Sequence, residues 1–161
     1  MKTLLIILLM TFSVVTFAQK ENSDLDNFAV LNKDSLEYVP WVVKDFKTVI
    51  LTSNEIDLVD SLFQDFKTKS NNGDTTIQAM GEIGLMNYKR QYLPVLNDNG
   101  EKIVWINCFC VSGSNLPHFS SNNPDKWNEE IIIVKDGGNC YFSVFLNLTT
   151  QRFEKLMVNG F

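Results

Sequence analysis

Hydrophobic and polar positions follow three different patterns along the chain, and each pattern predicts a different kind of element. Residues 4–17 form an unbroken apolar run without a charged side chain. Between residues 56 and 66, apolar positions recur mostly every third residue, as on one face of a helix. The C-terminal half contains short runs of β-branched and aromatic residues separated by Asn, Asp and Gly, which is typical of strands joined by tight turns.

One amphipathic helix is predicted directly after Thr52. Thr52 and Glu55 have the spacing of a capping box, in which each side chain satisfies a backbone N–H of the first turn. The apolar stripe that follows consists of Ile56, Val59, Leu62, Phe63 and Phe66. The helix should end within residues 70–74, a run of Ser, Asn, Gly and Asp. Asp57 and Asp60 lie three residues apart, and we expect both carboxylates to be solvated on the polar face.

The strand signals next to this helix are weak. Residues 36–43 are apolar and aromatic, but Pro40 lacks a backbone N–H, so they can form only an edge strand or an extended segment. Residues 46–52 are β-branched and apolar and are the better strand candidate. Residues 77–86 follow no clear period, and we assign them no element.

A first hairpin is predicted from residues 88–96 and 102–111, which flank a turn at 97–100 that contains Asn, Asp and Gly. Pro94 removes one hydrogen bond from the ladder of the first strand. The second strand is apolar on both faces apart from Asn107. It should therefore be a central strand that is covered on both sides.

A second hairpin is predicted from residues 130–135 and 140–148, which flank a two-residue Gly-Gly turn. In this register Ile133 pairs with Phe142. One face of the second strand then consists of core residues, namely Cys140, Phe142, Val144, Leu146 and Leu148. Residues 152–158 can form a last strand, although their alternation of apolar and polar positions is imperfect.

Together these elements predict an α+β fold, in which an antiparallel sheet of about five or six strands carries one main helix packed on a face. This arrangement is similar to cystatin-like folds. The chain has 161 residues and is 45% hydrophobic, which suits one packed domain. We expect that domain to span residues 36–161 and to follow a flexible polar arm at 19–35.

The N-terminus has the three parts of a secretory signal peptide. Lys2 supplies a positive charge, residues 4–17 supply the apolar run, and the small residues Thr16 and Ala18 precede Gln19. Spanning a bilayer takes about 20 apolar residues, so this run is too short for an anchor. We expect residues 1–18 to be removed and no later segment to cross a membrane, which makes the protein periplasmic or secreted.

Charge and motifs exclude several classes of function. The formal net charge is −5, and no stretch clusters Lys and Arg as phosphate binding requires, so we expect no nucleic-acid partner. The chain contains none of the common phosphate-binding, serine-hydrolase, zinc-protease or calcium-loop motifs. We therefore predict no catalytic residue and no cofactor.

The three cysteines allow several interpretations. In an exported chain they predict one disulfide. Cys110 with Cys140 is the favoured pair, because a disulfide between Cys108 and Cys110 would strain the strand that carries both. A simple meander, however, places Cys110 and Cys140 at opposite ends of the sheet, and buried free thiols are then the alternative. The cysteines together with His118 could in principle bind zinc, but the usual C-x-x-C spacing is absent and we predict no metal site.

The most suggestive segment is the polar loop at 112–128, which contains several large side chains. Long loops in compact domains commonly carry function, so we predict that His118, Phe119 and Trp127 bind a ligand or partner. In the alternative, these aromatic side chains fold back as a lid on the sheet. If the loop is not the contact surface, the next candidates are the sheet edges and the segment 36–43, which contains Tyr38 and Trp41.

Two blocks, residues 88–110 and 134–161, resemble a group of small exported proteins of Bacteroidetes that carries no assigned function. The resemblance covers about a third of the chain and contains no catalytic motif. It implies export and a shared sheet scaffold, and it implies no activity and no functional residue.

The sequence thus favours a non-enzymatic binding or interaction module of the bacterial envelope. Its partner would be an envelope protein, a peptide or a small ligand. The alternative is a small hydrolase or thiol enzyme, in which His118 would activate a cysteine as nucleophile.

The signal-peptide interpretation predicts that the mature chain begins at Gln19. Intact-mass spectrometry of the exported protein should give the mass of residues 19–161. A product that retains residues 1–18 would contradict both the cleavage site and the absence of an anchor.

Overall fold

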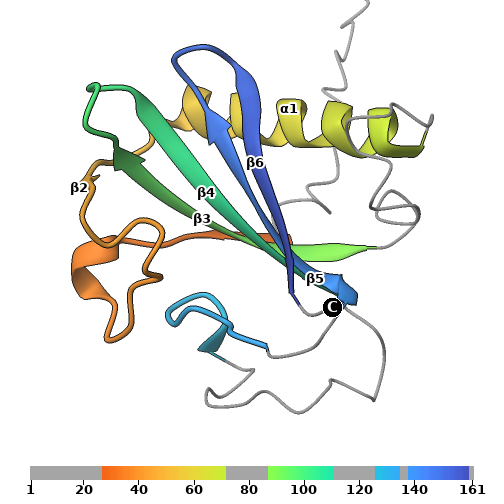
Figure 1. Cartoon of the computed structure of the whole chain (residues 1–161), viewed down its shortest axis with the longest axis horizontal. Helices are drawn as coiled ribbons and strands as arrows, with labels where there is room; N and C mark the ends of the chain where they lie inside the picture. The colour runs from red at the N-terminus through yellow and green to blue at the C-terminus, as the bar shows by residue number, and fades with distance from the viewer. Residues whose placement is uncertain (1–26, 72–86, 111–125, 135–137, 160–161) are drawn as a thin grey trace, which may run out of the picture.

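A mixed sheet and one long helix form the fold of the computed structural model (Figure 1). The structure describes residues 27–71, 87–110, 126–134 and 138–159. Within these residues the sheet has six strands, so the predicted α+β class is confirmed. The sheet is mixed and not purely antiparallel, because its first strand runs parallel to its neighbour.

The strand order is β1-β3-β4-β5-β6, and β2 pairs with the same strand β3. The strands are β1 (Phe28–Val30), β2 (Lys47–Thr48), β3 (Tyr88–Leu96), β4 (Lys102–Cys110), β5 (Gly138–Asn147) and β6 (Arg152–Asn159). The helix α1 spans Ser53–Asn71, and a 3-10 turn spans Lys33–Ser35. From β3 onward each strand is antiparallel to the next, which leaves β6 at one edge of the sheet.

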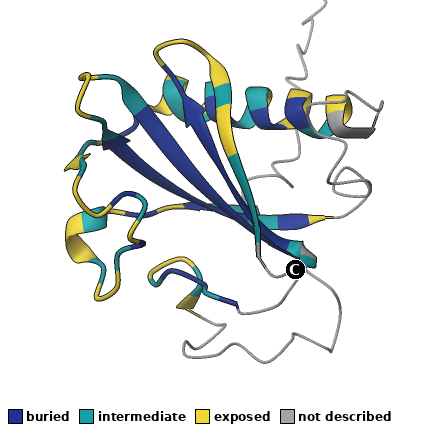
Figure 2. Cartoon of the chain, viewed as in Figure 1, coloured by how far each residue is buried: buried dark blue, intermediate teal, exposed yellow. Residues whose placement is uncertain are grey.

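The hairpin of β3 and β4 is the prediction that the structure confirms most fully. Its register runs from Tyr88 opposite Cys110 to Leu96 opposite Lys102. The side chain of Asn97 closes the turn, because its Oδ1 accepts hydrogen bonds from two backbone N–H groups of the loop. β4 is buried from residue 103 to 110, and Figure 2 shows it as part of the dark central band of the sheet. It is the covered central strand that its apolar sequence predicts.

The capping box at the start of α1 is also confirmed. The backbone N–H of Thr52 donates to Glu55 Oε2 at 2.8 Å, and the N–H of Glu55 donates to Thr52 Oγ1 at 3.3 Å. Lys102 Nζ lies 2.6 Å from Glu55 Oε1, so the same carboxylate also ties the helix to β4. These bonds to Lys102 and Thr52 lower the pKa of Glu55, because they favour its charged form.

α1 crosses one side of the sheet, which we call the helix face (Figure 1). Its predicted apolar stripe points inward, and Val59, Phe63 and Phe66 are buried. The ring of Phe63 stacks with Phe142 of β5 at 6.5 Å between centroids, and Phe66 contacts Phe153 of β6 at 4.7 Å. The predicted core face of β5 is confirmed, since Phe142, Val144, Leu146 and Leu148 are buried in this cluster and Cys140 packs against it.

The opposite side of the sheet, which we call the second face, is covered without a helix. Its buried strand residues pack beneath two irregular segments. The first segment, residues 31–46, contributes Leu31 and Val43, and the second, residues 126–134, contributes Ile131. Irregular segments cover a sheet less evenly than a helix does, and this face keeps a hollow that is described below.

Three predictions need correction. The described part of the expected flexible arm, residues 27–35, contains β1, which pairs in parallel with β3 and buries Ala29. The segment 36–43 forms no strand, and of the strand expected at 46–52 only the two residues of β2 are paired. The domain therefore begins before residue 36. The segment 77–86 lies outside the described residues.

The predicted hairpin of residues 130–135 with 140–148 is wrong. Residues 131–134 form no strand, and Phe142 pairs with Cys108 and Val158 instead of Ile133. Ile131, Ile132 and Val134 are buried because this segment lies across the second face, outside the ladder of the sheet. β5 therefore pairs directly with β4.

The expectation that Asp60 is merely solvated is also wrong. Asp60 Oδ1 pairs with Arg90 of β3, whose side chain is only 3% exposed. The Arg90 guanidinium lies within 6 Å of the rings of Phe28, Phe63 and Tyr92, at distances of 5.8, 5.2 and 5.9 Å. The ion pair thus fixes the middle of α1 to the sheet inside an apolar cluster.

Removing this carboxylate should destabilise the fold. Asp60→Ala leaves the buried Arg90 charge without its partner, and we expect it to lower the free energy of unfolding by about 3 kcal/mol. Asp57→Ala is the matched control, because Asp57 lies on the same helix and is exposed. It should change stability by less than about 0.5 kcal/mol. Urea unfolding of both variants measures the difference, and equal effects would contradict the role of the ion pair.

Candidate functional site

Of the three loop residues that the sequence singles out, the structure describes Trp127. His118 and Phe119 lie outside the described residues. Trp127 is half-buried, its ring meets Phe109 edge-on at 6.2 Å between centroids, and Lys89 Nζ lies 4.3 Å from its centroid. For Trp127 this placement favours the alternative of a lid folded onto the sheet.

A pair of buried amides explains why the segment 126–134 lies on the second face. Gln91 and Asn107 are neighbours on β3 and β4, and Asn107 Nδ2 donates to Gln91 Oε1 at 2.9 Å. Gln91 Nε2 donates to the carbonyl oxygens of Trp127 and Glu130. Gln91 Oε1 accepts from the N–H of Ile132 at 3.0 Å, and Asn107 Nδ2 donates to the Ile132 carbonyl at 2.8 Å. The side chains therefore supply the backbone partners that a strand would have obtained from the ladder.

Cys110 and Cys140 are joined by a disulfide bond, with 5.0 Å between their Cα atoms. The conflict seen in the sequence disappears because β5 pairs directly with β4. β5 therefore begins at the end of the sheet where β4 ends, next to the pair of Phe109 and Tyr141. The expected placement of the two cysteines at opposite ends rested on the incorrect hairpin.

The remaining cysteine offers little to thiol chemistry. Cys108 is fully buried on the helix face, and this burial raises the pKa of its thiol well above the ordinary value. A nucleophilic cysteine needs an accessible thiolate. The two other cysteines are bonded to each other. In the described part of the chain no three His, Cys, Asp or Glu side chains converge as a metal site would require.

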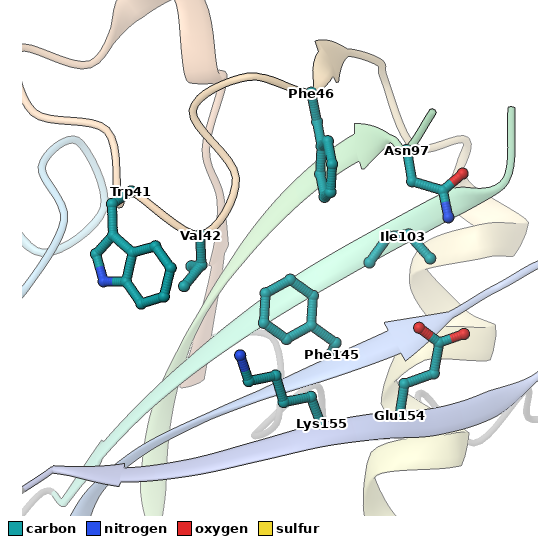
Figure 3. A pocket seen from close by; sticks show the side chains of 8 residues that line it. All are labelled: Trp41, Val42, Phe46, Asn97, Ile103, Phe145, Glu154 and Lys155. Carbon is teal, nitrogen blue, oxygen red and sulfur yellow. The ribbon is translucent and has the colours of Figure 1, made fainter. Parts of the chain in front are cut away.

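The second face contains a hollow of about 250 Å³, which we call the Trp41 cleft (Figure 3). Ile103 of β4 and Phe145 of β5 form its floor, and both are buried. The wall is made by the segment 41–46, and the rim carries the polar side chains. The wall and rim residues are Trp41, Val42, Phe46, Asn97, Glu154 and Lys155.

Trp41 is the most unusual residue of the cleft, because its large apolar side chain is 72% exposed. The turn that carries it is fixed on both sides. Val43 is buried, and its N–H donates to the carbonyl of Pro40 at 3.0 Å. Lys33 Nζ donates to the carbonyls of Lys44, at 2.6 Å, and of Phe46. The indole is thus presented to solvent by an anchored backbone.

A β-bulge sets the opposite rim. The register between β5 and β6 shifts between Phe145 and Leu146, and the extra residue of β6 at this point is Glu154. Figure 3 shows Glu154 and Lys155 both reaching from β6 toward the cleft. Asn147 Nδ2 donates to Glu154 Oε1 at 2.7 Å, and Lys155 Nζ lies 5.8 Å from the ring centroid of Trp41.

This arrangement has the chemistry of a small binding site. Its floor and wall are apolar, and an amide, a carboxylate and an ammonium group stand at the rim, where they can orient a ligand. The volume suits one side chain or one small ring. The sequence pointed only to Trp41, as a secondary candidate. The bulge could have been suspected from the broken alternation of residues 152–158.

The two described tryptophans at the surface of this face should respond differently to truncation. We expect Trp127→Ala to lower the free energy of unfolding by about 2 kcal/mol, because it removes ring contacts on the sheet. Trp41→Ala should change it by less than about 0.5 kcal/mol, because the indole is mostly exposed. Urea unfolding followed by circular dichroism measures both. Similar losses for the two variants would mean that Trp41 supports the fold instead of the cleft.

Comparison with known proteins adds no relative. The chain matches no protein-family model, no curated protein and no solved structure at a significant level. Among the described helices, none combines the length and the apolar character needed to cross a bilayer.

Proposed function

We propose that this domain is a non-enzymatic binding module, and that the Trp41 cleft holds one apolar or aromatic side chain of a peptide or protein partner. The observation that carries this proposal is the exposed indole of Trp41 on an anchored turn beside an apolar floor. Large exposed aromatic side chains mark interaction sites, and Trp is enriched among the residues that dominate binding energy.

The rim supports a peptide or protein partner. The carboxylate of Glu154 is already held by Asn147, so it can accept a backbone N–H with little further loss of side-chain freedom. Lys155 can shift from the indole toward a partner carbonyl. A ligand whose apolar group is flanked by amides satisfies the floor and the rim together.

We propose that the protein acts outside the cytoplasm, in the periplasm or as a secreted protein. The disulfide between Cys110 and Cys140 supports this location, because such bonds persist in oxidising compartments. The resemblance to exported proteins of Bacteroidetes belongs to the same proposal. A cystatin-like arrangement remains a proposal about the fold alone, supported by one helix followed by four antiparallel strands in chain order.

The loop residues His118 and Phe119 are kept as a proposed extension of the contact surface. Their support is the sequence alone, namely a long polar segment with embedded aromatic residues. Trp127 is a weaker candidate for contact with a partner, since its ring packs on the sheet.

A phage-displayed library of random dodecapeptides, selected against the domain, tests the function. We expect enriched peptides to bind the unmodified chain, and Trp41→Ala to weaken binding by at least about tenfold, as for a truncated anchor residue. Ile50→Ala is the matched control, because Ile50 is 84% exposed and does not line the cleft. It should leave binding unchanged. A selection that enriches nothing, or peptides indifferent to Trp41→Ala, would contradict the proposal.

A further inference from the structure

A small polar hollow lies on the helix face, near the β1 end of the strand order. We call it the Arg90 hollow. It has a volume of about 200 Å³ and is lined by residues of α1, by the start of β3 and by the residue before β1. Its polar lining residues are Asn27, Gln64, Lys67, Asn87, Tyr88 and Arg90. Gln64 and Asn87 are exposed, so the hollow opens to solvent.

The lining of this hollow is cationic, although the chain as a whole has a formal net charge of −5. Lys67 and Arg90 line it, and none of the described residues that line it is acidic. Asp60 offsets one of the two charges, because it pairs with Arg90 from outside the lining. The nearby C-terminal end of α1 adds no attraction for an anion, since that end of a helix carries partial negative charge. The charge preference of the hollow therefore comes from its side chains.

The guanidinium of Arg90 has an incomplete set of hydrogen bonds. Its side chain is 3% exposed, and Nη1 donates to Asp60 Oδ1. Nε is buried and has no hydrogen-bond partner within the described residues. A buried N–H without an acceptor costs free energy, so such a group marks a place where a bound ion or water completes the bonding. Arginine holds oxyanions through two parallel N–H groups, and the edge that carries Nε remains for this use.

Two further donors line the same hollow. Arg90 lies opposite Cys108 in the register of β3 and β4. Burial raises the pKa of Cys108, while the charges of Arg90 and Lys67 act in the opposite direction, so both cations act on the same buried region. Burial also raises the pKa of Tyr88, so its phenol stays protonated and can donate a hydrogen bond. The ammonium of Lys67 and the phenol of Tyr88 can therefore serve oxygens of an anion that Arg90 leaves unbonded.

We propose that the Arg90 hollow binds a small oxyanion, a carboxylate or a phosphate group, through the guanidinium of Arg90 and the ammonium of Lys67. Drug-sized ligands occupy about 300–1,000 Å³, so a hollow of about 200 Å³ favours a compact anion. The three lining amides can donate to its remaining oxygens. The hollow lies on the other face of the sheet from the Trp41 cleft, so this site is independent of the proposed function.

Arginine side-chain NMR tests the site at the group that carries the proposal. The chain contains two arginines, and the exposed Arg152 of β6 is an internal control for Arg90. The mature chain is titrated separately with acetate and with inorganic phosphate, at an ionic strength held constant with chloride. For at least one of these anions we expect the Nε–H signal of Arg90 to shift and saturate with a Kd of about 1 mM or below. The Arg152 signal should stay unchanged, and an Arg152→Lys variant assigns the two signals.

A pair of lysine variants tests whether the anion sits in the hollow. Lys67→Gln removes the second cation and leaves Arg90 and Asp60 in place, and we expect it to weaken binding by at least about tenfold. Lys69→Gln is the matched control, because Lys69 lies on the same helix, is exposed and does not line the hollow. It should change the Kd by less than about twofold, as for a screened surface charge.

The anion that binds more tightly identifies the ligand class, since acetate represents carboxylates and inorganic phosphate represents phosphate groups. An Arg90 signal that shifts without saturating, or that shifts as much as the Arg152 signal, would indicate general screening and overturn the site. An Arg90 signal that neither anion moves would overturn it as well. Equal losses for the two lysine variants, or unchanged binding in Lys67→Gln, would contradict the assignment of the anion to this hollow.

Discussion

The hydrogen bonds of Gln91 and Asn107 determine the layout of the second face. Two buried amides on adjacent central strands bond to each other and to the backbone of residues 127–132. Unpaired buried amides would cost about 1–3 kcal/mol each, so these bonds favour the placement of this segment on the sheet. Because the segment is not a strand, β5 lies against β4, and Cys110 meets Cys140. The strand order and the disulfide are thus linked to the backbone groups to which the Gln91 and Asn107 side chains bond.

The uneven cover of the second face creates the candidate site. Residues 126–134 cover the part of the sheet near Phe109 and Tyr141, and residues 31–46 cover the part near Leu93 and Val95. The floor at Ile103 and Phe145 lies at the margin of this cover. A helix of even width would have filled that space. On the helix face, by contrast, α1 buries a continuous apolar stripe, and a larger hollow lies beside the edge strand β6.

Elements with local signals could be predicted from the sequence, and elements that depend on distant partners could not. The capping box of Thr52 and Glu55 and the Asn97 turn are complete within a few residues, so helix start and hairpin were found. Residues 131–134 have the composition of a strand, but the side chains that bond the backbone of Ile132 lie 25 and 41 residues away in the chain. β1 was missed for a similar reason, because three residues within a polar stretch become a strand only beside β3. The Trp41 cleft is lined by residues from four separate segments, and no local sequence pattern indicates that these segments meet.

The disulfide also makes the long connection between β4 and β5 a closed loop. The bond joins residues 30 positions apart and stabilises the fold by about 3–4 kcal/mol in the chain-entropy account. A single peptide-bond break anywhere between Cys110 and Cys140 would leave the two fragments covalently attached at the end of the sheet. Insertions in this connection lengthen a loop whose ends are already fixed. A single cut in the connection therefore leaves β4 and β5 joined, whereas the segment 126–134 within it stays constrained by its hydrogen bonds to Gln91 and Asn107.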